Sequence, residues 1–152
     1  IIVGFPGETD EEFEETLEIL QEIEYDEIFS FVYSRRPHTT AIKIYPDDVP
    51  DDVKRSRLAR VQALQKEISL GKNREKVGSV EEILIEGRSK LSRGQVMGRT
   101  RTNRIVNVLG PERWIGETIQ VRITGASANS LLGDLVTEVE SSTGYHVRGM
   151  VS

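Results

Sequence analysis

In the first half of the chain, the spacing of apolar residues is typical of strands in some segments and of helices in others. Residues 1–3 form a short apolar run, and residues 27–33 are rich in β-branched and aromatic side chains, so both are predicted strands. Between them, apolar side chains recur at helical spacing over residues 13–23, with glutamates on the other side. A strand, a helix and a second strand in this order predict a βαβ unit with parallel strands.

The ends of the helices can also be predicted. Thr9 and Glu12 form a capping box, so the first helix should start near Asp10. Apolar positions over residues 53–68 predict a second amphipathic helix, with residues 50–52 suited to its first turn and its end near residues 71–76. Residues 34–52 contain three prolines and are too long for an ordinary connection, so they predict a functional or a mobile loop.

From residue 80 onward the pattern changes to short strands separated by turn residues. The predicted strands are residues 80–86, 94–99, 104–108, 117–123 and 130–136. Short strands in this number predict a small β-barrel, in which Trp114 is expected to serve as a plug. The tail, residues 138–152, is expected either to add an edge strand through Tyr145 to Val151 or to be disordered.

The composition restricts the chemistry of the chain. Of its 152 residues, 37% are hydrophobic, 30% are charged and none is cysteine. Without cysteine the chain itself can hold no disulfide, thiolate zinc site or iron–sulfur cluster. His38 and His146 stand alone, which predicts no metal site. No apolar run approaches the roughly 20 residues of a membrane helix, so we expect a cytoplasmic protein without a membrane partner.

Charge is distributed unevenly. Residues 1–76 carry 11 Lys and Arg against 17 Asp and Glu, whereas residues 77–140 carry 8 of each. From residue 88 to residue 104 there are six basic residues and no acidic one. Such a stripe can attract phosphate even when the whole protein is acidic, and a guanidinium group can donate two parallel hydrogen bonds to it. The alternative is a solvated hairpin whose charges bind nothing.

Several segments carry motifs of one family. IVGFPGET at residues 2–9 resembles the turn after the fifth strand of radical-SAM barrels, and YSRRPHT at residues 33–39 resembles the loop after the sixth strand. RVQALQKEIS at residues 60–69 resembles a final barrel helix, and GRTRTNRIVN at residues 98–107 resembles the signature of a TRAM domain, a small RNA-binding barrel. His38 stands where the loop motif usually has Gly, which is costly if a positive φ is needed there.

On these motifs the chain resembles the MiaB-type tRNA methylthiotransferases. The resemblance implies that residues 1–76 are an α/β remnant of a radical-SAM (partial TIM-type) barrel and that residues 77–137 are an all-β TRAM (OB-like) barrel. It also implies a parent enzyme that uses S-adenosylmethionine and two [4Fe-4S] clusters to 2-methylthiolate isopentenyladenosine beside the anticodon. Because the chain opens inside an apolar run and lacks cysteine, we expect the amino-terminal part that holds the clusters to be missing. We therefore expect this piece to be inactive alone and to carry no catalytic residue.

Site residues follow from the same resemblance. The edge that meets the adenosine of the cofactor is expected to include Ile2, Gly4, Gly7, Phe31 and Tyr33. The surface that binds tRNA is expected to include Arg88, Lys90, Arg93, Arg99, Arg101, Asn103, Arg104 and Asn107. The barrel signature favours tRNA over a ribosomal-protein substrate. A methylthiotransferase acting on threonylcarbamoyl-adenosine and a stand-alone RNA-binding module remain alternatives.

Overall fold

The computed structural model describes residues 1–90 and 92–136 of the chain. Contacts divide the chain into two compact units, Ile1–Lys72 and Asn73–Ser152. The division falls close to residue 76, where the sequence analysis placed the domain boundary. The predicted tail, residues 138–152, lies outside the described residues. No helix in the described ranges has the length and apolar character that crossing a membrane requires.

The first unit has the predicted order of strand, helix and parallel strand. Strand β1 (Ile2–Val3) pairs in parallel with β2 (Phe31–Val32), and helix α1 (Asp10–Ile23) connects them. The second strand is shorter than the predicted residues 27–33 because β1 offers only two residues to pair with. A short helix, α2 (Thr40–Ile44), lies in the segment predicted as a loop.

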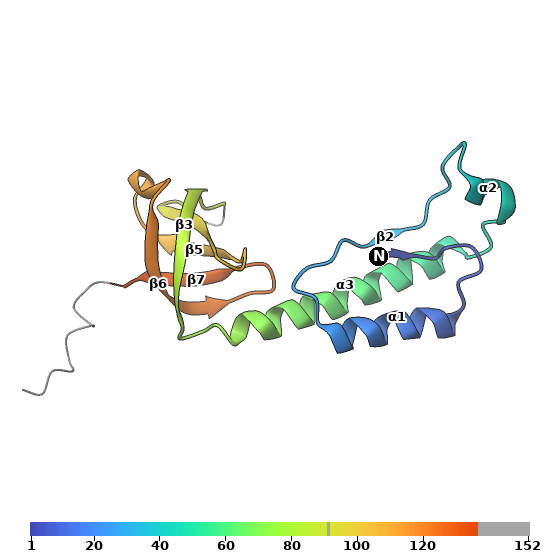
Figure 1. Cartoon of the computed structure of the whole chain (residues 1–152), viewed down its shortest axis with the longest axis horizontal. Coiled ribbons are helices and arrows are strands. Elements are labelled where there is room, and N and C mark those ends of the chain that lie inside the picture. Colours follow the sequence, from blue (N-terminus) through green and yellow to red (C-terminus); the bar gives the residue numbers. More distant parts are fainter. Residues whose placement is uncertain (91, 137–152) are drawn as a thin grey trace, which may run out of the picture. The chain divides into compact units, whose positions relative to one another are not determined.

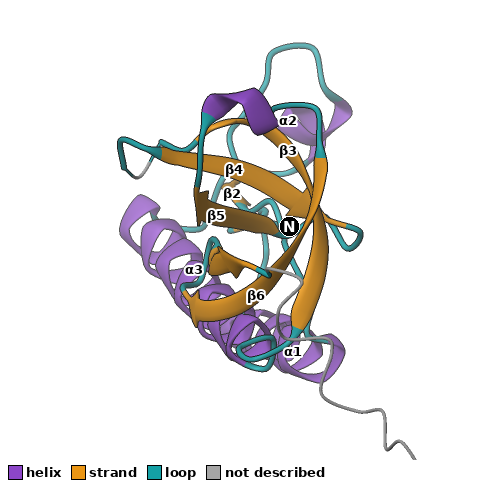
Figure 2. Cartoon of the chain, turned by 90° about the vertical axis from the view of Figure 1, so that its left-hand side faces the viewer, coloured by secondary structure: helices purple, strands orange, loops and turns teal. Residues whose placement is uncertain are grey.

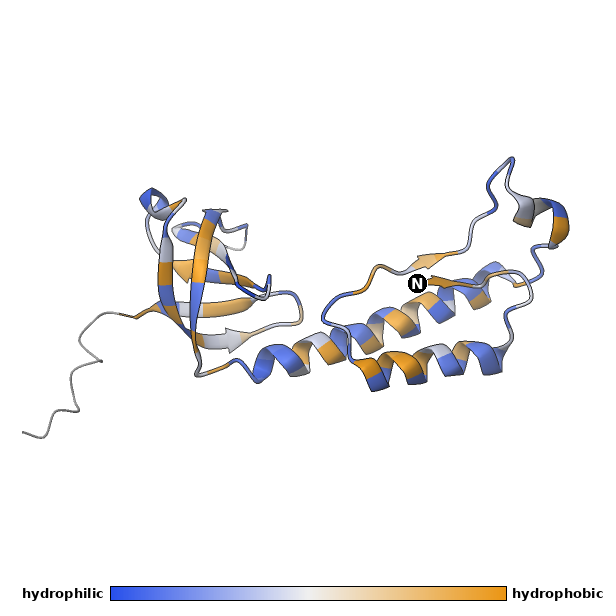
Figure 3. Cartoon of the chain, viewed as in Figure 1, coloured by the Kyte–Doolittle hydropathy of each residue, from blue (hydrophilic) through white to orange (hydrophobic). Residues whose placement is uncertain are grey.

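The capping box predicted at the start of α1 is confirmed. The Thr9 hydroxyl accepts a hydrogen bond from the Glu12 amide at 3.2 Å, and the Glu12 carboxylate accepts one from the Thr9 amide at 2.9 Å. Helix α3 (Asp51–Arg74) runs beside α1, and the β1–β2 ribbon lies along both helices (Figure 1). Hydrophobic and hydrophilic residues alternate along both helices (Figure 3), which lets each bury one face.

A small apolar core joins the elements of the first unit. Val3 of the sheet, Phe13 and Leu20 of α1 and Val61 of α3 are almost completely buried against one another. Apolar side chains therefore pack against only one face of the two-stranded sheet. The opposite face carries Ile2 and Phe31, whose exposed fractions are both 58%.

The second unit is a closed barrel. Its strands are β3 (Val80–Arg88), β4 (Gln95–Thr100), β5 (Ile105–Leu109), β6 (Thr118–Ala126) and β7 (Leu131–Leu135). They close in the order β3-β4-β5-β7-β6. Figure 2 shows strands β3, β4, β5 and β6 curving around the barrel. All five predicted strands are confirmed, with ends shifted by a few residues.

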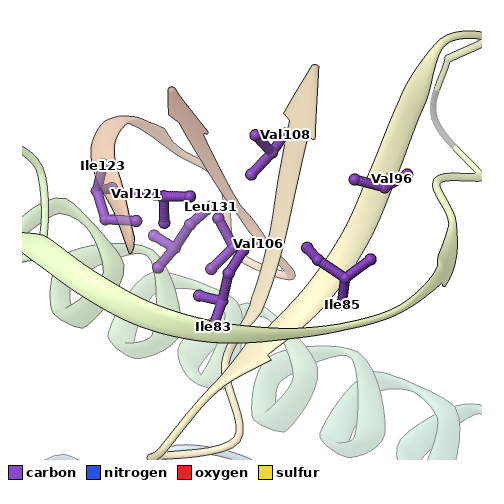
Figure 4. Packing of buried hydrophobic residues seen from close by; sticks show 8 residues of the cluster. All are labelled: Ile83, Ile85, Val96, Val106, Val108, Val121, Ile123 and Leu131. Carbon is purple, nitrogen blue, oxygen red and sulfur yellow. The ribbon is translucent and has the colours of Figure 1, made fainter. Parts of the chain in front are cut away.

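The hydrophobic cluster inside the barrel is aliphatic. Eight buried side chains form it (Figure 4), namely Ile83, Ile85, Val96, Val106, Val108, Val121, Ile123 and Leu131. They come from every strand, as the period-two pattern of β-strands requires. Trp114, in the short 3-10 helix η1 (Glu112–Trp114), packs against this cluster while staying partly exposed, so it lies at the margin of the core.

Candidate nucleic-acid interface

The β3–β4 hairpin and the turn that follows it carry most of the predicted RNA-binding residues. Along β3, Ile83 and Ile85 point into the barrel, so the alternating positions between and beside them point outward. Arg99 lies on β4, opposite Leu84 of β3. Arg101 follows in the next turn, and its side chain is 84% exposed.

The turn between β4 and β5 is built by polar residues of the TRAM-like motif at residues 98–107. The Thr100 hydroxyl accepts a hydrogen bond from the Arg104 amide at 3.1 Å, and Thr100 is itself buried. Asn103 has φ +66°, a left-handed conformation that Asn tolerates better than most residues. The Arg99 guanidinium donates to the Asn103 side-chain oxygen at 3.0 Å. The signature thus fixes a tight turn and aligns an arginine beside it.

Gly98 of the same signature allows the two strands to approach each other. A Cβ atom at this position would collide with the backbone of Leu84 and Ile85. Just beyond them, the pairing register shifts between Ile85 and Gly87, so Glu86 occupies a bulge. Bulges commonly redirect a side chain, and Glu86 points to the outer face occupied by the arginines.

The expectation that the basic stripe lacks counter-charges is wrong. Three of its arginines form ion pairs with glutamates: Arg101 with Glu82 at 2.8 Å, Arg99 with Glu86 at 3.1 Å and Arg88 with Glu112 at 2.7 Å. These glutamates lie outside the 88–104 segment in sequence, and antiparallel pairing and the η1 turn bring them back to it. The sequence signal that could have revealed two of them is the alternation of Glu82 and Glu86 with the buried isoleucines.

These ion pairs are exposed and therefore weak. A hydrogen bond to Glu82 and the charge of that carboxylate raise the pKa of Arg101 above its ordinary value, so the guanidinium keeps its charge. Water surrounds both partners, and exposed pairs contribute little to the stability of a fold. The arginines thus remain available to a stronger anionic ligand.

The tip of the β3–β4 hairpin adds two further cations. Lys90 and Arg93 are exposed, and neither has an ion-pair partner among residues 1–90 and 92–136. With Arg88 and its ion-pair partner Glu112 they line an open cavity of about 680 Å³. Positive charge at this end of the barrel is therefore less compensated than along the arginine pairs.

Two predicted RNA-binding residues serve the barrel itself. Asn107 is 4% exposed, and its side-chain oxygen accepts a hydrogen bond from Ser89 at 2.7 Å. Arg104 is half-buried and donates to the side-chain oxygen of Asn73 at 2.5 Å. A buried side chain is poorly placed for a contact with RNA. Asn107 is one of three successive buried residues in β5, where the alternation of inward and outward side chains is broken.

The residues predicted at the cofactor edge share one region of the first unit. Ile2 and Phe31 are paired neighbours in the sheet and expose apolar surface. Tyr33 follows β2, and its ring stands edge-on to that of Phe5 with centroids 5.1 Å apart. Gly7 has φ +83° and open space around its Cα. An exposed apolar surface beside an open turn suits the flat face of an adenine.

Gly4 has a packing role that the sequence did not predict. Its missing side chain leaves room for Lys54 of α3, which would collide with any Cβ atom there. The Gly4 amide donates to the Glu8 carboxylate at 2.5 Å, so this backbone donor is already used. The Gly7 amide likewise donates to Asp48 at 2.8 Å. The turn is therefore held from within the protein, and Gly4 is required for packing.

Two buried cations of α3 hold this turn, and neither was identified from the sequence. Lys54 is 2% exposed and forms an ion pair with Asp47. Arg57 donates to Glu8 and to Asp10, at 2.7 Å in each case. Burial acts to lower the pKa of Arg57, but hydrogen bonds to both carboxylates and their charges raise it overall, so the group stays cationic.

The loop that follows β2 contains the unusual His38. Its φ is +68°, so the loop does adopt a positive φ where the family motif usually has glycine. Within the described ranges, no cluster of three or more His, Cys, Asp and Glu side chains is arranged to hold a metal ion.

Comparisons with known proteins agree with the division into a helical unit and a barrel. The TRAM domain family matches residues 74–136. The chain is 47% identical to the tRNA-2-methylthio-N(6)-dimethylallyladenosine synthase of Syntrophobacter fumaroxidans, over 91% of this chain and 30% of that protein. It is 49% identical to the synthase of the same name from Halalkalibacterium halodurans, over 92% of this chain and 26% of that protein. For the Clostridium botulinum synthase the identity is 48%, over 88% and 30%. The chain thus spans less than a third of the length of these relatives.

Proposed function

We propose that this chain belongs to the tRNA methylthiotransferase family and forms the tRNA-binding part of a radical-SAM enzyme acting on isopentenyladenosine beside the anticodon. Membership rests on relatives that are 47% to 49% identical over about nine-tenths of the chain. The barrel, which the TRAM family matches, delivers the anticodon arm. The first unit forms one end of the catalytic barrel.

The observation that carries the RNA-binding role is the group of arginines at the surface of the barrel. Arg88, Arg99 and Arg101 lie on or next to one hairpin, and Lys90 and Arg93 extend the positive surface to its tip. The guanidinium group of arginine can donate two parallel hydrogen bonds to a phosphate. Contacts with phosphates position an RNA without reading its sequence. Specificity for one adenosine would then come from the catalytic barrel.

An exposed apolar surface and a glycine turn in the first unit support a role of this unit in holding S-adenosylmethionine. Ile2 and Phe31 would contact the adenine face, and Gly7 would let the ligand approach the turn. The cofactor, when bound, would supply the radical chemistry of the reaction. Because this chain has no cysteine, the iron–sulfur clusters would be held by another part of the enzyme.

The function can be tested on the tRNA of the organism that makes this protein. Deleting the gene should abolish 2-methylthio-isopentenyladenosine and accumulate isopentenyladenosine, as measured by mass spectrometry of digested tRNA. Reintroducing the intact gene is the matched control and should restore the methylthio group. Loss of methylthiolated threonylcarbamoyl-adenosine, or of a methylthio group on a ribosomal protein, would contradict the proposed substrate.

A further inference from the structure

The arginine surface of the barrel is already occupied by carboxylates of the same chain. Glu82 and Glu86 flank Leu84 on the outer face of β3, and Arg99 lies directly opposite Leu84 on β4. Arg99 pairs with Glu86, and Arg101 pairs with Glu82. Two ion pairs therefore stand side by side on the face proposed to bind RNA.

Each pair uses the part of the guanidinium group that would otherwise bind a phosphate. Arg101 directs both Nε and Nη2 at one oxygen of Glu82, at 3.0 and 2.8 Å. Arg99 directs Nε at Glu86 at 3.1 Å. A phosphate can accept the same parallel hydrogen bonds, so carboxylate and phosphate compete for one set of donors.

We infer that Glu82 and Glu86 are exchangeable counter-charges, which RNA phosphates displace from Arg99 and Arg101 when the barrel binds tRNA. The inference rests on the proposed tRNA-binding function and adds the competition within the protein. Both glutamates are more than one-third exposed, so a displaced carboxylate can return to water. Exposed pairs are weak, and breaking them costs the fold little.

The neighbouring strand provides a place for one displaced carboxylate. The second oxygen of Glu82 accepts a hydrogen bond from the side-chain amide of Gln120, on β6, at 3.4 Å. Glu82 can therefore keep a partner after Arg101 has turned to a phosphate. The expected consequence is moderate affinity for tRNA, because every bound phosphate first replaces a carboxylate and then lies near it.

The opposite role for the glutamates, in which they help the arginines to bind RNA, makes the opposite prediction. If they orient the arginines for RNA, removing their charge would weaken binding. If they compete with RNA, removing their charge would strengthen it. The sign of the change in affinity therefore decides between the two roles.

The experiment measures tRNA binding to the full chain by fluorescence anisotropy. The variant Glu82→Gln/Glu86→Gln should bind roughly 2- to 30-fold more tightly, the range that corresponds to two exposed pairs. The matched control is Glu75→Gln/Glu117→Gln, which removes the same charge from exposed positions of the same unit. It should change the affinity less, because salt screens charges that do not contact the RNA.

A second comparison, in a variant that lacks the two arginines, separates the displacement of the glutamates from a general effect of their negative charge. In the variant Arg99→Gln/Arg101→Gln, the two Glu→Gln substitutions should have no more effect than the control pair. Equal melting curves would show that the variants are folded. Unchanged or weaker binding by Glu82→Gln/Glu86→Gln overturns the exchange, whereas failure of the unsubstituted chain to bind tRNA overturns the proposed function itself.

Discussion

Both units of this protein use ion pairs, but at different depths. In the first unit Arg57 is 5% exposed and holds Glu8 and Asp10 at the start of α1. In the barrel Arg101 is 84% exposed and meets Glu82 at the surface. The same residue types therefore serve the fold where they are buried and remain available to a ligand where they are exposed.

The cores of the two units explain this difference. Five strands close the barrel around eight aliphatic side chains, so its backbone is ordered without help from charges. The first unit has only a pair of two-residue strands and two long helices around a smaller core. Its loops and turn are fixed by buried polar contacts, chiefly those of Lys54 and Arg57.

The largest expected effect is the loss of the buried pair. The variant Arg57→Met leaves the mostly buried Glu8 without its cation and should destabilise the first unit by about 3–5 kcal/mol. Amide hydrogen exchange should show faster exchange in α1, while the barrel strands keep their protection. The control Arg60→Met removes the exposed pair with Glu14 and should have a much smaller effect. Equal losses in both variants would contradict the comparison.

A smaller effect is expected from a change in the barrel core. Ile83 is completely buried, and Ile83→Val should lower the free energy of unfolding of the barrel by about 0.5–1.5 kcal/mol. Hydrogen exchange in β3 and β6 should accelerate while α1 is unaffected. The matched substitution Ile119→Val lies at a partly buried site and should cost less. A loss confined to the first unit would contradict the independence of the two cores.

The exposed arginine pairs should contribute least to the fold. Arg101→Gln should leave the melting temperature of the barrel unchanged, because water replaces the hydrogen bonds to Glu82. Its effect should appear in RNA binding instead. A clear drop in melting temperature would show that this pair is structural and would weaken the distinction between the two units.

A further small effect concerns the pH dependence of the exposed pair between the helices. The hydrogen bond from Arg60 lowers the pKa of Glu14, so the pair stabilises the first unit above the ordinary pKa of the carboxyl group. That contribution should be lost as the pH falls through the lowered pKa. An NMR titration of Glu14 should show the lowered pKa, and Arg60→Gln should return it to the ordinary range. An unshifted titration in the unsubstituted chain would contradict the pairing.

Local patterns predicted much of this fold because they depend on near neighbours in sequence. The Thr9 capping box and the five barrel strands follow from spacing of a few residues. Contacts between distant residues were not predictable in this way. Lys54 reaches the turn at Gly4, and Glu82 reaches Arg101, only because the chain folds back on itself.

The candidate site shows the same limit. A stripe without acidic residues in sequence became a set of ion pairs in space, because β3 lies beside β4. Asn107 was expected on the surface, but three successive residues of β5 are buried. His38 does have a positive φ at the glycine position of the loop motif, a condition that the sequence alone left open.

The most direct test of the account is the salt dependence of tRNA binding by the full chain. If Arg88, Arg99 and Arg101 each neutralise a phosphate, the logarithm of the binding constant should fall with the logarithm of salt at a slope of about −2 to −3. Replacing all three by Gln should flatten that slope. Replacing three exposed cations of the first unit by Gln, namely Arg35, Arg55 and Lys66, should leave it nearly unchanged. Equal affinity and slope in the barrel variant and the unsubstituted chain would contradict the central claim that this arginine surface binds tRNA.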